Sequence, residues 1–247
     1  MHSATAWAPY CGAAPLPGEL LARWNFDPLL IAALAVATFA WAQLRKPSGS
    51  GRTSLLAALA VLLIAFVSPL CALSSALFSA RTVHHLLLVA VAAPLLALAW
   101  GGSGRRIPLG PAAALHFLIF WLWHAPLLYG WALASDSAYW LMQASLLGSA
   151  AVFWAAALGS GARTPSVAIA FIAAIAQMGL LGALLTFAPA PLYAPHFATT
   201  GAWGLGALED QQLAGLIMWV GSLPIYLAAA MAVLSRRLRF EAGEAAA

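Results

Sequence analysis

The sequence predicts an all-α polytopic membrane protein, a bundle of about seven transmembrane helices with its N-terminus outside the cytoplasm and its C-terminus inside. Hydrophobic residues make up 64% of the 247 residues and charged residues only 7%, against roughly 25% charged in an ordinary soluble domain. So few charges could not cover a soluble fold. The net charge of +4 comes from arginines in short loops between apolar runs, so we expect a lipid bilayer and no nucleic acid as partner.

Seven apolar runs are each long enough to cross a bilayer, which takes about 20 helical residues. Breaks rich in glycine, proline and charge separate them. The strands of a β-barrel would alternate apolar and polar residues, whereas these runs are continuously apolar. The predicted spans are Pro28–Leu44, Ser54–Leu73, Val83–Trp100, Pro111 to about Trp131, Ala138–Leu158, Pro165–Phe187 and Gln211–Leu234.

Basic residues gather on one side of these spans and predict the orientation. Nine fall in the loops after the first, third and fifth spans and in the tail: Arg45, Lys46, Arg52, Arg105, Arg106, Arg163, Arg236, Arg237 and Arg239. The other side holds only Arg23 and Arg81. Because cytoplasmic loops carry the excess of Lys and Arg, residues 1–27 form an outer, periplasmic segment, residues 28–235 the transmembrane domain and residues 236–247 a cytoplasmic tail. The expected location is the inner membrane of a bacterial cell.

The chain has two cysteines, Cys11 and Cys71, and both fall on the outer side in this topology. An oxidising outer compartment permits a disulfide between them. The sequence gives no distance between the two residues, so a disulfide, two free thiols and metal ligation all stay open. No Cys-x-x-Cys pair is present to indicate a redox or zinc site.

Polar side chains concentrate in the outer third of the predicted bundle. They are His84, His85, His124, His196, Asp210, Gln211 and Gln212. Ionisable groups in or near lipid are costly, and their default interpretation is function. Imidazole suits copper, zinc and iron, whereas thioethers select monovalent copper, and Met142, Met178 and Met218 are available. We therefore expect a Cu(I) site at His85 and His124, which lie at matching depth, with help from His84 or Met218.

Each candidate also has a plainer interpretation. His116, roughly 12 Å deeper than His124 at the helical rise, could hydrogen-bond across a helix interface. His196 could be a solvated loop side chain. Asp210 opens a helix, where the helix dipole favours an acid. Gln211 and Gln212 could satisfy neighbouring helix ends. The functional alternative is a supporting role, in which Asp210, Gln211 and Gln212 orient the copper ligands or contact a partner. His196 belongs to the same supporting group.

Several motifs carry a resemblance to a known family. The most specific is Leu208–Trp219, which reads LEDQQLAGLIMW, followed by Gly182–Tyr193, which reads GALLTFAPAPLY. The others are Trp123–Tyr129, His85–Leu88 with Ala93–Leu96, and Tyr10–Gly12 with Arg23–Pro28. Through these motifs, nearly the whole chain resembles the multi-spanning cytochrome c oxidase assembly factors first associated with caa-type oxidases, the CtaG family.

The resemblance implies a non-enzymatic role in assembling a haem-copper oxidase, with oxidase subunits as partners and either copper delivery or subunit maturation as the task. Where the family has a His-x-x-Gln-His pattern at the start of the third span, this chain has Arg81, His84 and His85. Where the family's fifth span carries a Glu-His pair, this chain has Met142 and Gln143. Two family ligands are therefore absent, while His84 is an additional imidazole.

Two other function classes stay open from the residues alone. A copper or small-solute transporter would continue polar residues towards the cytoplasmic face, where only His116 and Gln177 offer any. A haem-binding electron carrier needs axial ligands on facing helices at matched depth, which His85 and His124 could supply. The sequence shows no nucleophile–base constellation and no phosphate-binding loop, which argues against ordinary catalysis. It gives no prediction of oligomeric state.

Overall fold

The computed structural model describes residues 9–45, 49–100, 107–159 and 161–245, and these ranges contain helices and no strand. The all-α prediction is confirmed. Four helical segments are long and apolar enough to cross a membrane, or up to six if each of two bent helix pairs counts as one span. The four are Phe78–Ala99, Asp136–Leu158, Thr164–Thr186 and Ala207–Arg239. The number seven and the orientation stay predictions.

Every predicted span corresponds to a helical segment. The helices are α1 (Pro28–Arg45), α2 (Ser50–Phe66), α3 (Pro69–Ala76), α4 (Phe78–Leu86), α5 (Ala93–Ala99), α6 (Leu109–His124), α7 (Pro126–Ala134), α8 (Asp136–Leu158), α9 (Thr164–Thr186), α10 (Ala207–Leu216) and α11 (Ser222–Ala245). Short 3-10 turns lie at Pro17–Ala22, Ala194–His196 and Thr200–Trp203. The apolar stretch Pro28–Leu44 of α1 is shorter than the other candidate spans.

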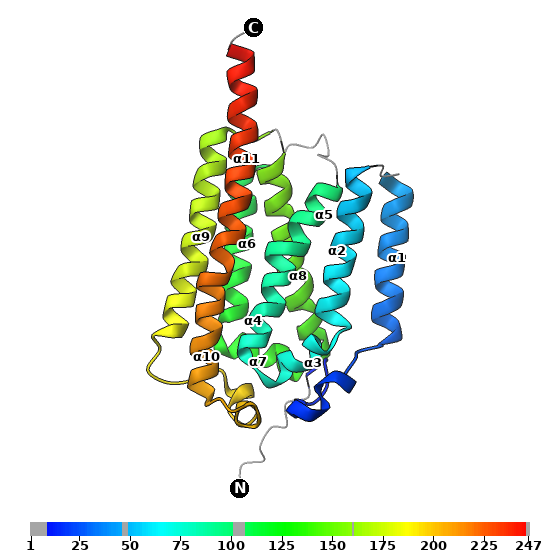
Figure 1. Ribbon diagram of the computed structural model, residues 1–247, viewed down its shortest axis with the longest axis vertical. Helices are drawn as coiled ribbons and strands as arrows, with labels where there is room; N and C mark the ends of the chain where they lie inside the picture. The colour runs from blue at the N-terminus through cyan, green and yellow to red at the C-terminus, as the bar shows by residue number, and fades with distance from the viewer. Residues whose placement is uncertain (1–8, 46–48, 101–106, 160, 246–247) are drawn as a thin grey trace.

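Two predicted spans, Ser54–Leu73 and Pro111–Trp131, are bent pairs of helices and not continuous ones. The bend is 46° between α2 and α3 and 75° between α6 and α7. Both breaks precede a proline that opens the next helix, and the residues before these prolines, Ser68 and Ala125, are extended. A residue before proline is pushed out of the helical region, so the sequence itself causes the bends. In Figure 1, α3 and α7 lie at the same end of the bundle.

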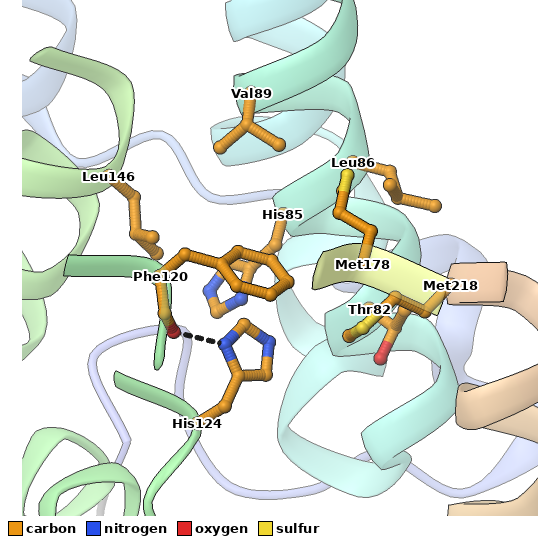
Figure 2. A pocket seen from close by; sticks show the side chains of 9 residues that line it. All are labelled: Thr82, His85, Leu86, Val89, Phe120, His124, Leu146, Met178 and Met218. Atoms are coloured by element: carbon orange, nitrogen blue, oxygen red, sulfur yellow. Dashed lines mark hydrogen bonds between the residues drawn. The ribbon is translucent and has the colours of Figure 1, made fainter. Parts of the chain in front are cut away.

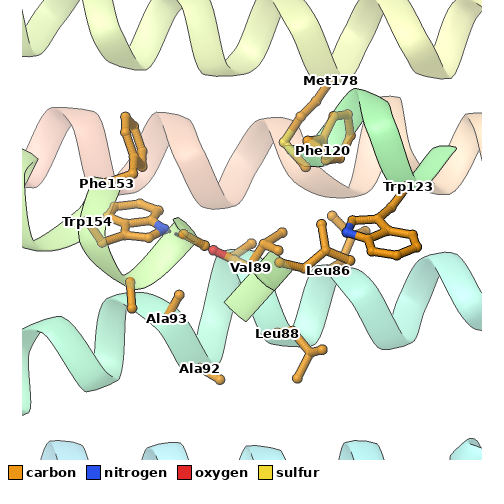
Figure 3. Close-up of a cluster of buried hydrophobic side chains, with 14 of the residues drawn as sticks. Leu86, Leu88, Val89, Ala92, Ala93, Phe120, Trp123, Phe153, Trp154 and Met178 are labelled. Carbon is orange, nitrogen blue, oxygen red and sulfur yellow. Dashed lines mark hydrogen bonds between the residues drawn. The ribbon is translucent and has the colours of Figure 1, made fainter. Parts of the chain in front are cut away.

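Two other helical segments contain a π-helical turn. One, η2 (Leu87–Ala92), joins α4 to α5, and the other, η5 (Ile217–Gly221), joins α10 to α11. In the first, the Val89 carbonyl would accept from residue 94 in π geometry, but Pro94 has no N–H. The indole Nε1 of Trp154 donates to that carbonyl instead, at 2.9 Å (Figure 3). The π turn therefore leaves no unpaired carbonyl at Val89.

The outer segment is tied to one end of the bundle. Cys11 and Cys71 form a disulfide with a Cα–Cα distance of 5.3 Å, which answers the question that the sequence left open. Beside it, the Tyr10 ring stacks on the Tyr139 ring of α8, with centroids 5.1 Å apart. This segment and the far end of α11 lie at opposite ends of the bundle (Figure 1). Residues 1–8, residues 246–247 and three residues used for the orientation, Lys46, Arg105 and Arg106, lie outside the described ranges.

Candidate functional site

A small pocket lies between α4, α6, α8, α9 and the two π turns (Figure 2). Its lining residues are Thr82, His85, Leu86, Val89, Phe120, His124, Leu146, Met178 and Met218. Four of these side chains, two imidazoles and two thioethers, can bind a soft metal ion. The remaining walls are almost wholly apolar, so the pocket keeps water away from those four groups.

His85 on α4 and His124 on α6 lie beside each other in this pocket. Their ring centroids are 5.9 Å apart and the rings are inclined by 81°. With metal–nitrogen bonds of about 2.0 Å, as for zinc, two imidazoles on opposite sides of one ion would have centroids roughly 6 Å apart. The structure therefore brings together the two histidines that the sequence pairs by depth, at a spacing suited to a shared ion.

The backbone fixes which nitrogen of His124 is free. Its Nδ1 lies 2.7 Å from the Phe120 carbonyl, and a carbonyl only accepts hydrogen bonds, so Nδ1 carries the proton. In a neutral imidazole, Nε2 then keeps its lone pair, the arrangement that second-shell carbonyls give to metal-binding histidines. His85 Nε2 is buried and has no hydrogen-bond partner among the described residues. Each ring thus has a nitrogen available for a ligand.

Two methionines complete the donor set. Met178 on α9 and Met218 in η5 are 1% and 2% exposed, and Figure 2 shows both to the same side of the imidazole rings. Met218 was a predicted ligand, whereas Met178 was only one of three available methionines, because nothing in its apolar span marks it. No group of three or more His, Cys, Asp or Glu side chains that could hold a metal ion occurs in the described ranges. Beyond the two imidazoles, the thioethers are the soft donors that the pocket lining offers to a metal ion.

Both π turns shape the pocket wall. Val89 of η2 and Met218 of η5 line it, and η2 begins two residues after His85. A π turn inserts an extra residue and changes the direction of the side chains that follow, and such turns are frequent at functional sites. Pro94 and Pro224, each just beyond a π turn, remove a backbone N–H there. The local sequence thus accounts for the irregular backbone around the donors.

His84 and His116 lie outside the pocket. The His84 ring packs edge-on against Phe66, with centroids 5.0 Å apart, and is fully buried. It therefore does not join His85 and His124 in the pocket lining. His116 Nδ1 lies 3.2 Å from the Ser149 hydroxyl of α8, so the inter-helix hydrogen bond expected as its plainer interpretation is present.

Residues 21–103 and 108–239 match the model of the cytochrome c oxidase caa3 assembly factors. The chain belongs to this family. The match includes every residue that lines the pocket and leaves out only residues 1–20, 104–107 and 240–247. Comparison with curated proteins and with solved structures gave no significant match. Family membership supports a role in cytochrome c oxidase assembly and hence contact with oxidase components, and the apolar helices support a place in the membrane.

In this assembly factor, His196 is not a solvated loop side chain. It is 2% exposed, and its Nε2 lies 2.7 Å from the Tyr129 hydroxyl. Burial, and then the positive charge of Arg81, lower the pKa of His196 to about 3. The ring is therefore neutral at physiological pH. We assign the Tyr129 hydroxyl as donor to Nε2, which leaves the proton of the ring on Nδ1.

Asp210 caps a helix other than its own. It accepts hydrogen bonds from the backbone N–H groups of Phe78, at 2.6 Å, and Ser79, at 3.2 Å, and from the Ser79 hydroxyl. These groups form the first turn of α4, where a carboxylate is favoured by the unpaired N–H groups and the helix dipole. Glu209 performs the local task by accepting from the Gly206 N–H at 2.7 Å. Asp210 therefore joins α10 to the helix that carries His85.

The two glutamines after Asp210 differ in their hydrogen bonds: Gln211 uses its side chain, whereas Gln212 uses its backbone carbonyl. Gln211 Oε1 accepts from the Leu192 N–H at 2.7 Å, and its Nε2 donates to the Leu185 carbonyl at 3.4 Å. Gln211 thus satisfies the end of α9 and the loop after it, as the plainer interpretation expected. Gln212 is half-buried, and its backbone carbonyl accepts a long hydrogen bond of 3.5 Å from the Thr186 hydroxyl. Neither side chain lines the pocket.

Proposed function

We propose that this assembly factor binds one Cu(I) ion transiently at His85, His124, Met178 and Met218 and passes it to a subunit of cytochrome c oxidase. The observation that supports the proposal is the convergence of two imidazoles, each with one ring nitrogen available, and two buried thioethers in one water-poor pocket. All four donors are neutral, so the bound ion keeps its charge. A neutral, soft donor set favours Cu(I) over divalent zinc or copper, because burying one uncompensated charge costs less than burying two.

The predicted topology supports delivery on the outer side of the bacterial inner membrane. The four long segments and the two bent pairs make up to six spans, and in this proposal the shorter apolar helix α1 is taken as the seventh. The positive-inside rule then puts the disulfide-bonded segment and the His124 end of α6 outside. With this orientation, the pocket lies nearer to the outer side of the membrane than to the cytoplasmic side, where the basic C-terminal end of α11 lies. A partner subunit would receive the ion from that face.

Two alternatives fit the pocket less well. Val89, Phe120 and Leu146 line it on the side towards the predicted cytoplasmic end, and this apolar wall does not favour a transport path. A haem bound between His85 and His124 would have to displace such side chains to make room for its macrocycle. Net copper flux in proteoliposomes would revive the transporter, and a Soret band in the purified protein would revive the haem carrier.

A competition titration tests the site. The purified chain in nanodiscs is titrated with Cu(I) against a chromophoric chelator, and we expect about one ion per chain. The His85→Ala/His124→Ala variant should lose this binding while keeping its helical circular dichroism. His116→Ala is the matched control, since His116 is an equally buried imidazole outside the pocket, and it should bind like the parent. Copper binding by the double variant equal to that of the parent would exclude the site.

A second experiment tests the task in the cell. Oxidase purified from membranes that lack the protein should contain its haem but lack copper, and the parent gene should restore the copper where the double histidine variant does not. An oxidase with full copper and haem would remove copper delivery from the proposal. Subunit maturation would then be the function that family membership supports.

A further inference from the structure

Arg81 on α4 is a buried cation that makes no side-chain hydrogen bond of good geometry within the described residues. It is 0% exposed, and its Nε, Nη1 and Nη2 atoms have no hydrogen-bond partner among the described residues. Its guanidinium carbon lies 5.3 Å from the ring centroid of Tyr139, a cation–π contact that stabilises the charge but fills none of the N–H groups. Buried charges are normally both paired and hydrogen-bonded, so this arginine needs a partner.

The groups around Arg81 add further unused donors. Gln143, one turn after Tyr139 on α8, makes no amide hydrogen bond of good geometry among the described residues, although the Tyr139 hydroxyl lies near it. The His84 ring likewise makes none there, although the Ala65 carbonyl lies near it. The guanidinium also lies within electrostatic reach of His196, whose protonated Nδ1 makes no hydrogen bond of good geometry among the described residues, although the Ala76 carbonyl lies near the ring. Gln143, His84 and His196 are each at most 2% exposed. An excess of N–H donors around a positive charge is the environment that binds an anion.

Asp210 does not accept hydrogen bonds from these donors. It belongs to the same cluster, since its charge acts on Tyr129 together with that of Arg81. However, both of its carboxylate oxygens accept from the first turn of α4. Asp210 therefore offsets the charge of Arg81 only through space. The nearest acceptors for the guanidinium are the Tyr129 and Tyr139 hydroxyls, and neither makes a hydrogen bond of good geometry with it.

The cluster is closed on the side of the outer segment. Tyr10 stacks on Tyr139, and the Cys11 sulfur lies 3.4 Å from the Tyr139 hydroxyl. The Cys11–Cys71 disulfide holds this cover in place. Tyr129 and Tyr139 are at most 1% exposed. A ligand of Arg81 must therefore be small enough to be enclosed, and a single guanidinium charge matches a monovalent ion.

We propose that Arg81, assisted by Gln143, His84 and His196, binds one small monovalent anion of the size of chloride in a closed site beside Tyr129 and Tyr139. The anion accepts the unused N–H groups and neutralises the buried charge. Phosphate, sulfate and bulky carboxylates are excluded by charge or size. This site is separate from the copper pocket, and the proposal does not depend on copper binding.

Equilibrium binding of radiolabelled chloride tests the proposal. The full chain is placed in nanodiscs of zwitterionic lipid, with ionic strength held constant by gluconate, and should bind about one chloride per chain. Arg81→Gln should abolish this binding. Arg23→Gln is the matched control, because Arg23 lies at the same end of the chain's fold, is only partly buried and donates to the Ala13 carbonyl, and this variant should bind chloride like the parent.

Competition between anions for the parent protein tests the site without any substitution, and so applies even if Arg81→Gln does not fold. Unlabelled bromide and nitrate should displace the label, whereas sulfate and gluconate should not. Gln143→Leu, which keeps the charge of Arg81, should weaken chloride binding without abolishing it. The proposal is overturned if the parent binds no chloride, if a folded Arg81→Gln variant binds it undiminished, or if sulfate competes as well as bromide.

Discussion

Asp210 on α10 holds the N-terminus of α4, the helix on which His85 faces His124. The Phe78 and Ser79 groups that it accepts from lie two helical turns before His85. Asp210 itself lies on α10, and α10 continues into η5, which carries Met218. One carboxylate therefore fixes the relative position of two donor-bearing segments, although it does not line the pocket itself.

Replacement of Asp210 by Asn should disturb both stability and the site. An amide can accept on one atom only, so hydrogen bonds worth about 1.5–3 kcal/mol each to a charged acceptor are lost. We expect a lower free energy of unfolding and weaker Cu(I) binding, measured by chemical unfolding and by chelator competition. Glu209→Gln is the control, since Glu209 is exposed and a Gln oxygen can still accept from Gly206. Unchanged copper affinity in Asp210→Asn would separate Asp210 from the pocket.

The two thioethers can be tested with a nearly isosteric change. Met→Leu keeps the volume of the side chain and usually costs less than about 1.5 kcal/mol of stability, but it removes the sulfur. Met178→Leu and Met218→Leu should each weaken Cu(I) binding about tenfold or more, which corresponds to about 1.4 kcal/mol. Met142→Leu, equally buried but outside the pocket, should leave the affinity unchanged. If all three variants bind alike, the thioethers are not ligands.

The sequence predicted the parts of this structure that depend on local chemistry. Continuous apolar runs predicted the helices, and Pro69 and Pro126 explain where two of them break. Depth along the spans paired His85 with His124, because helical rise converts residue number into position along the membrane normal. Such depth does not give rotation about the helix axis. His84 therefore could not be separated from His85, although the two face different neighbours.

Other features depend on long-range packing and had no local signal. Met178 reaches the pocket from α9 because of how α9 packs against η5, and its span is apolar throughout. The burial of His196 against Tyr129 requires the loop after α9 to fold over α7. Arg81 was interpreted as an outer-side charge that replaces a family histidine, whereas its position in the fold makes it a fully buried cation. In each case, the position of the side chain depends on a segment distant in sequence that packs against it, and the sequence alone does not identify that segment.

Close packing of α9 and α10 requires glycine at position 215. A Cβ atom added there would lie 2.5 Å from the Gly182 carbonyl oxygen, a backbone atom that cannot move aside. Gly215→Ala should therefore lower the free energy of unfolding by about 1–3 kcal/mol through overpacking. Gly148→Ala on α8 is the matched control, because a Cβ there meets no atom within 4 Å. It should be neutral or stabilising by about 0.4–1 kcal/mol, so equal destabilisation of both would contradict this packing account.

The Cys11–Cys71 disulfide should stabilise the fold through the length of the loop that it closes. The two residues are 60 apart in sequence, and cross-links of this kind typically contribute about 2–4 kcal/mol. Cys11→Ser/Cys71→Ser should unfold at a correspondingly lower denaturant concentration. Reductant should bring the parent to the same midpoint and leave the double variant unchanged. A parent insensitive to reductant under conditions that break the bond would show that the disulfide contributes no stability.

His196 should make the stability of the protein fall on mild acidification. Its pKa is about 3 in the folded protein, below the ordinary value of about 6.5. Between these values the unfolded chain binds a proton that the folded protein excludes, so stability is lost as pH falls from about 6.5, by up to about 1.4 kcal/mol per pH unit. His196→Gln cannot titrate and can still accept from Tyr129. The pKa of Asp27 is also lowered, chiefly by its hydrogen bond from Tyr10, but it starts from 3.8 and so acts only at lower pH.

The measurement is the free energy of unfolding of the parent and of His196→Gln between pH 8 and pH 5. The difference between the two proteins should be constant above about pH 7 and should shift by about 2 kcal/mol in favour of the variant by pH 5. The other buried histidines are present in both proteins, so their contributions cancel. A difference that does not change with pH would mean that His196 takes up a proton in the folded protein as readily as in the unfolded chain, against the burial that the structure gives it.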